Sequence, residues 1–117
     1  MSKTYEQQRS RAQRIEDESI RERVLRGLEV VRARYGDDWA DHIEPADLDL
    51  QSGSCCVLGQ LQMHINGVYG EPYWHALREI DGDVEENPSA FGFDAVVGQT
   101  AEYEALTDAW LLVIEDD

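Results

Sequence analysis

Residues 19–36 read SIRERVLRGLEVVRARYG, and this stretch decides the fold because it carries the clearest helical pattern of the chain. Its apolar residues return every three or four positions, which places them on one face of a helix. They are Ile20, Val24, Leu28, Val31 and Tyr35. Ser19 and Glu22 have the spacing of a capping box, and Gly36 is suited to end the helix in a left-handed conformation. The sequence therefore predicts an amphipathic helix over residues 20–35 with one face on a core.

Three further helices are predicted after this one. Ser54 can cap a helix over residues 55–66, Pro72 suits the first turn of a helix that Gly82 ends, and Thr100 can cap a last helix. Their inner faces are predicted to hold Val57 or Leu58, Leu61 and Ile65, then Tyr73, Trp74, Leu77 and Ile80, and finally Tyr103, Leu106, Trp110 and Ile114. The predicted fold class is mainly α, a small single-domain helical bundle of about four helices with long ordered loops.

The segments between these helices are expected to reach the core at a few apolar positions. These positions are Trp39 and Ile43 in a helical turn, Leu48 and Leu50 in an ordered loop, and Phe91-Gly92-Phe93. Residues 81–89 (DGDVEENPS) are expected to be an acidic loop. A short two-stranded pairing between residues 44–54 and 81–98 is left open.

The N-terminal residues 1–19 are polar, with Tyr5, Ala12 and Ile15 as apolar anchors. A continuous helix from Tyr5 to Tyr35 would be roughly 46 Å long. A domain of this size is only about 35 Å across. We therefore expect a polar N-terminal arm over residues 1–19, which is either mobile or a helical extension, and an acidic helical domain over residues 20–117. Within the arm, residues 1–14 are expected to be mobile or to protrude from the domain.

The basic and acidic residues are distributed unequally along the chain. Residues 1–34 carry nine basic and six acidic side chains, net +3, whereas residues 35–117 carry one basic residue, Arg78, and nineteen acidic ones, net −18. Such an anionic body repels nucleic acid and anionic membranes and attracts basic protein surfaces. With 42% hydrophobic residues, the chain is too apolar for a disordered acidic tail. No apolar run is long enough to span a membrane and no signal-peptide pattern is present, so a cytoplasmic protein is expected.

Two acidic segments are the candidate partner-binding residues. The first holds Asp37, Asp38, Asp41, Glu44, Asp47 and Asp49, and the second holds Asp81, Asp83, Glu85 and Glu86. The cationic face of the first helix holds Arg21, Arg23, Arg26, Arg32 and Arg34. Its net positive charge is too small to offset the repulsion between nucleic acid and the acidic body of residues 35–117, so nucleic-acid binding is not expected. We expect this face to pack on acidic surface, in the same chain or in a second copy, where it would support a homodimer.

Cysteine and histidine offer weaker candidates. Cys55, Cys56, His42, His64 and His75 are the soft-metal ligands, but their spacing differs from that of a structural zinc site, so no metal and no cofactor are predicted. A cysteine at a helix N-terminus has a lowered pKa and could act as a nucleophile with His75. Asp81-Gly82-Asp83 opens like a calcium loop, but the glycine and glutamate that should follow are misplaced. No catalytic residues are assigned from these patterns.

Several short stretches resemble a known group of proteins. They are Asp37-Asp38-Trp39-Ala40, Cys56-Val57-Leu58-Gly59-Gln60-Leu61, Phe91-Gly92-Phe93 and Ala105-Leu106-Thr107-Asp108-Ala109-Trp110. In this order, over roughly residues 24–114, the chain resembles small uncharacterised acidic proteins of actinobacteria and their phages. The resemblance implies an intracellular, phage-borne protein and no particular activity.

Three hypotheses of function follow. The favoured one is an acidic interaction protein that binds a basic surface of a host or phage protein as an inhibitor or modulator, with DNA mimicry as its extreme form. The second is a self-assembling structural protein without an external partner. The third is a cysteine-dependent enzyme using Cys56 and His75.

Overall fold

The computed structural model describes residues 4–52, 55–66, 82–96 and 99–114. Their elements are α1 (Tyr5–Ala12), α2 (Glu18–Tyr35), the 3-10 helices η1 (Trp39–His42) and η2 (Pro45–Asp47), α3 (Val57–Asn66), α5 (Gly82–Glu86), the 3-10 helix η3 (Pro88–Phe91), and α6 (Thr100–Ile114). No strand occurs in these ranges. The predicted mainly α fold of about four helices with long loops is confirmed.

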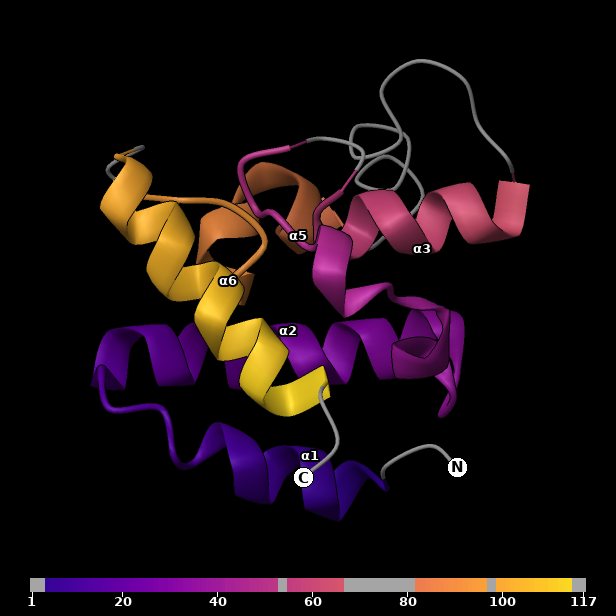
Figure 1. The fold of residues 1–117 in the computed structure, drawn as a ribbon, viewed down its shortest axis with the longest axis horizontal. Coiled ribbons are helices and arrows are strands. Elements are labelled where there is room, and N and C mark those ends of the chain that lie inside the picture. Colours follow the sequence, from indigo (N-terminus) through magenta and orange to yellow (C-terminus); the bar gives the residue numbers. More distant parts are fainter. Residues whose placement is uncertain (1–3, 53–54, 67–81, 97–98, 115–117) are drawn as a thin grey trace.

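Helix α2 runs through the middle of the molecule, and α1 and α6 both pack against it (Figure 1). Its predicted inner face is buried at Ile20, Val24, Leu28 and Val31. The capping box at Ser19 is wrong, because the helix begins at Glu18, two residues earlier than predicted. Asp17 is the cap, and its side chain accepts a hydrogen bond of 3.1 Å from the backbone N–H of Ile20. Gly36 ends the helix at φ +94°, a backbone angle that favours glycine.

The predicted protruding arm is wrong for the described part of residues 1–14. Thr4 and Gln7 form a capping box for α1, which packs along α6 and α2 instead of continuing α2. Ala12 and Ile15 are buried as predicted, and Gln8 is fully buried, where it accepts a hydrogen bond from the indole N–H of Trp39 at 3.3 Å. The chain breaks its helix after Ala12 and turns back, so α1 fits within a body about 35 Å across.

Trp110 forms the centre of the core. Its indole N–H donates to the carbonyl oxygen of Gly92 at 2.8 Å, the Phe93 ring stacks on it at 5.7 Å, and Trp39 meets it edge-on at 6.0 Å. Gly27 of α2 lies directly beneath this indole, where a side chain has no room. The predictions that Trp39, Phe93 and Trp110 enter the core are confirmed.

Further helix boundaries differ from the sequence prediction. Residues 82–86 form α5 and residues 88–91 form η3, so the predicted acidic loop is wrong there; Val84 turns into the core and gives this segment an apolar face. Helix α3 begins at Val57, with Val57, Leu58 and Leu61 buried as predicted. Thr100 is the first residue of α6 and not its cap. Ser54 and the predicted helix over residues 72–80 lie outside the described residues.

We predict that Gly27→Ala destabilises the protein. A Cβ there would lie 2.1 Å from the carbonyl oxygen of Phe91 and 2.8 Å from Cζ2 of Trp110. Overpacking of this kind costs about 1–3 kcal/mol and outweighs the gain in helix propensity of about 1 kcal/mol. Gly82→Ala is the matched control, because its Cβ would meet nothing within 4 Å. Urea unfolding should show a lower midpoint for the first variant alone, and equal midpoints would refute this account of the core.

Candidate functional site

The carboxylates of the first predicted acidic segment are all exposed, and we call this set the acidic ridge. It consists of the carboxylates of Asp37, Asp38, Asp41, Glu44, Asp47 and Asp49, all of which are exposed. Between them Trp39, Ile43, Leu48 and Leu50 turn inward and are buried. Apolar anchors therefore fix the backbone from the end of α2 through η1 and η2, and the carboxylates are the residues left outside.

Gln60 of α3 holds the ridge in place. Its Oε1 accepts from the backbone N–H of Glu44 at 2.7 Å, and its Nε2 donates to the carbonyl oxygens of Glu44 at 3.3 Å and Cys55 at 3.0 Å. Further along, the backbone N–H of Leu50 donates to the hydroxyl of Thr107 at 3.1 Å. These bonds tie a segment of short 3-10 helices and loops to α3 and α6, so the carboxylates are presented by a defined backbone.

Local contacts adjust the charge of the ridge at its N-terminal end. Asp37 pairs with Arg32 at 2.7 Å, but its side chain remains 87% exposed. Asp38 lies 3.4 Å from Nε2 of His42, whose ring stacks on that of His64 at 3.9 Å between centroids. The Arg32–Asp37 pair therefore offsets part of the negative charge at this end of the ridge.

The second acidic segment is carried by a different part of the fold. Asp83, Glu85 and Glu86 are exposed on α5, whereas Asp81 lies outside the described residues. Helix α5 packs on η3, while η1 of the ridge packs on α3 and the end of α2. The described contacts thus do not join the two segments into one packed unit.

Arg23 is not a surface residue, contrary to its predicted role in self-association. Its side chain is 9% exposed. Its guanidinium group donates to the carbonyl oxygens of Ser89 at 2.7 Å and Asp94 at 2.8 Å, and it pairs with Glu102 at 3.1 Å. Arg23 thus ties α2 to Ser89 in η3, whose carbonyl oxygen also accepts from the backbone N–H of Gly92 at 3.2 Å, and to Asp94 in the loop that follows.

The other arginines of α2 also contact their own chain. Arg21 donates to the carbonyl oxygen of Ile15 at 2.9 Å and Arg26 to that of Ala90 at 3.1 Å. Arg32 pairs with Asp37, and Arg34 lies over the ring of Tyr35 at 5.3 Å. These contacts agree with one of the two packing arrangements expected for this cationic face, contact within the same chain; contact with a second copy stays a prediction.

The outer surface is consequently more acidic than the composition suggests. Every described Asp and Glu side chain is exposed except those of Asp94 and Glu102, which are half-buried. By contrast, Arg11 and Arg23 are buried. Arg11 donates to the carbonyl oxygen of Leu112 in the last turn of α6, where a positive charge also stabilises the helix dipole.

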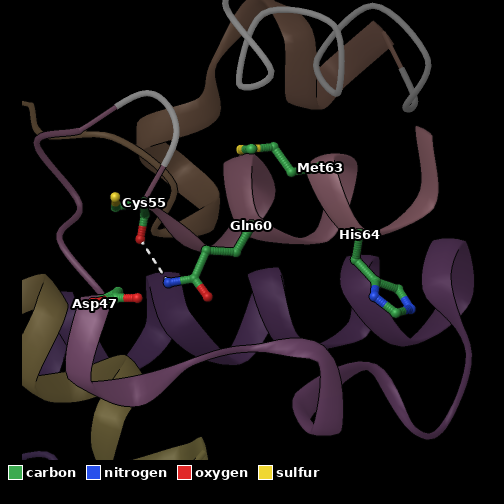
Figure 2. Close-up of a pocket in the computed structure, with 5 residues that line it drawn as sticks. All are labelled: Asp47, Cys55, Gln60, Met63 and His64. Atoms are coloured by element: carbon green, nitrogen blue, oxygen red, sulfur yellow. Dashed lines mark hydrogen bonds between the residues drawn. The ribbon is translucent and has the colours of Figure 1, made fainter. Parts of the chain in front are cut away.

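A hollow adjoins the ridge at its C-terminal end. It has a volume of about 470 Å³ and is lined by Asp47, Cys55, Gln60, Met63 and His64. Figure 2 shows Gln60 reaching toward Asp47 and Cys55, with Met63 and His64 further along α3. The sequence analysis missed Met63 and the bracing role of Gln60. A glutamine within the otherwise apolar run VLGQL was the available signal for Gln60.

The cysteine environment is opposite to that of a nucleophile. Cys56 lies at the start of α3, as predicted, and its Sγ accepts a hydrogen bond from the N–H of Gly59 at 3.3 Å. Burial outweighs this helix-terminal contact and raises the pKa of the Cys56 thiol to about 12. The expected lowering of the pKa is therefore wrong. His75 lies outside the described residues, and no group of three or more metal-ligating side chains occurs within them.

Comparison of the chain with known protein families, with characterised proteins and with solved structures gave no match. Within the described ranges, none of the helices combines the length and the apolar character needed to cross a membrane. The functional argument therefore rests on the ridge and its surroundings.

We predict that Arg23→Met destabilises the protein by about 2–4 kcal/mol, because it removes the hydrogen bonds to the carbonyls of Ser89 and Asp94 and the largely buried ion pair with Glu102. Arg26→Met is the matched control, since Arg26 is exposed and should cost less than about 1 kcal/mol. Chemical unfolding of both variants provides the measurement. Equal losses would show that the buried guanidinium group has no special structural role.

We also predict that Cys56 resists alkylation. In a Cys55→Ser variant, a thiol with a pKa near 12 instead of 9.0 has about a thousandfold less thiolate at neutral pH. Its reaction with iodoacetamide should become fast only when urea unfolds the protein. Rapid labelling of the folded variant would contradict this environment and would revive the cysteine-dependent enzyme.

Proposed function

We propose that the protein is an acidic binding module whose ridge docks on a basic surface of a partner protein. The observation that carries this proposal is the ridge itself, six exposed carboxylates on a backbone held by buried apolar residues and by Gln60. A fixed array of like charges speeds encounter with a complementary surface and selects against acidic partners.

The inward placement of arginines supports this proposal over self-assembly through the cationic helix. Arg23 is committed to Ser89, Asp94 and Glu102 of its own chain and has little surface left to offer a second copy. The raised pKa of Cys56 likewise favours a binding protein over a cysteine-dependent enzyme. The proposal includes the cytoplasmic setting implied by the resemblance to actinobacterial and phage proteins, with a host or phage protein as the partner that is inhibited or modulated.

DNA mimicry is the extreme form of the same proposal. Carboxylates arranged along a ridge would then occupy a surface that normally contacts phosphates. The exposed carboxylates of α5, namely Asp83, Glu85 and Glu86, would extend the contact to a large partner. A partner that loses nucleic-acid binding when the protein is added would identify this form.

We predict that neutralising the ridge abolishes partner capture. The ridge variant carries Asp37→Asn, Asp38→Asn, Asp41→Asn, Glu44→Gln, Asp47→Asn and Asp49→Asn, whose side-chain oxygens still accept the local hydrogen bonds. The control variant neutralises Glu6, Glu16, Asp17, Glu18, Glu22 and Glu29 in the same way, all of which are exposed and lie in α1, α2 or the segment between them. Both variants lose the same charge.

Affinity capture from a lysate of the source organism, at low and at several-fold higher salt, provides the measurement. The wild type and the control variant should enrich the same basic protein at low salt, with affinities within about threefold, and the ridge variant should bind it at least about tenfold more weakly. High salt should release it, because charges are screened beyond about 8–10 Å. Equal capture by both variants, capture retained at high salt, or no partner at all would refute the proposal.

A further inference from the structure

The hollow beside the ridge lies between η2 and the outer side of α3. Its lining joins Asp47, the last residue of η2 and a member of the ridge, to Cys55, Gln60, Met63 and His64. Its volume of about 470 Å³ falls within the range of roughly 300–1,000 Å³ typical of ligand-binding clefts. It therefore has room for an apolar side chain of another molecule.

The chemistry of the lining favours an apolar occupant. Met63 is 44% exposed, and methionine adapts its shape to different apolar partners. The amide of Gln60 is already bonded to the backbone of Glu44 and Cys55. An apolar group that covers Gln60 would thus leave no unsatisfied amide behind, and this removes the usual penalty for covering a polar side chain.

The charge beside the hollow indicates what flanks that apolar group. Asp47 stands at the edge of the hollow, and Glu44 precedes it on the same turn. We propose that the hollow receives an apolar side chain of a linear partner segment whose neighbouring Arg and Lys residues contact the acidic ridge. This inference rests on the proposed function and specifies the partner segment as basic and apolar together.

An apolar anchor combined with basic neighbours would fix the register in which a basic segment binds along the ridge. Exposed ion pairs contribute little affinity each and allow a basic segment to slide along the carboxylates. A buried apolar anchor, surrounded by polar contacts that exclude water, usually supplies most of the binding energy of an interface. Met63 supplies the apolar contact, and the ridge supplies the polar rim.

The test uses two pools of fluorescent nine-residue peptides. In both pools every second position is Arg or Lys. The positions between them hold a mixture of Leu, Ile, Val, Met and Phe in the basic–apolar pool, and Ser and Gly in the basic–polar pool. The wild type should bind the basic–apolar pool at least about tenfold more tightly, as expected when one aliphatic side chain is buried. Fluorescence anisotropy at fixed salt measures both affinities.

Met63→Asp and Val96→Asp form the matched pair of variants. Each adds one negative charge in place of an exposed apolar side chain, and Val96, 68% exposed, is not part of the hollow. Met63→Asp should lose the preference for the basic–apolar pool while binding the basic–polar pool at least as well as the wild type. Val96→Asp should keep the preference. Far-UV circular dichroism establishes that both variants are folded.

The outcomes separate this inference from the proposed function. Equal binding of the two pools by the wild type, or a preference that survives Met63→Asp, overturns the role of the hollow. In either case salt-sensitive binding that disappears in the ridge variant leaves the proposed function standing. Failure of both pools to bind at low salt overturns the inference, and loss of the preference in both single variants overturns the assignment to Met63.

Discussion

The structure depends on the contact between Trp110 and the backbone of α2 at Gly27. The indole lies where a Cβ on Gly27 would stand, and its N–H is bonded to the carbonyl oxygen of Gly92. Gly92, at φ +73°, in turn approaches the backbone of Arg23 in α2. Helix α6, the loop after η3 and α2 are thereby locked together at backbone distance. Helix α1 packs on two of these three segments, so its position follows from theirs.

Arginine serves this fold as a hydrogen-bond donor more than as a surface charge. The loops around η3 expose carbonyl groups to the interior, and a guanidinium group can satisfy several of them at once from a single helix. Arg23 does so for Ser89 and Asp94, and Arg11 does so for Leu112 in the last turn of α6. These two positive charges thus lie inside the molecule, and the described surface is more acidic than the composition alone would indicate.

The sequence predicted those features that depend on apolar periodicity. The helix over residues 18–35 and the inward turns of Trp39 and Trp110 were evident, because an apolar stripe has few alternative interpretations. Features that depend on buried polar groups were not evident. The sequence predicted a protruding arm in place of α1 because residues 1–19 are mostly polar, yet two of those polar residues, Gln8 and Arg11, are buried. The ridge carboxylates were identified from composition, but the hollow joins residues of η2 and α3 and has no local signature.

The physical reason to propose a role for the ridge is that its exposed carboxylates share one sign of charge on an ordered backbone. Neighbouring carboxylates on a fixed backbone repel one another, and solvent relieves that repulsion only in part. Helix α2 contributes a counter-charge at Asp37, which pairs with Arg32 at 2.7 Å while its side chain stays 87% exposed. Gln60 and the buried apolar residues hold the charges together in spite of this repulsion. A basic partner of the kind proposed would meet carboxylates on a backbone that is already ordered, so binding would cost little further ordering of the ridge.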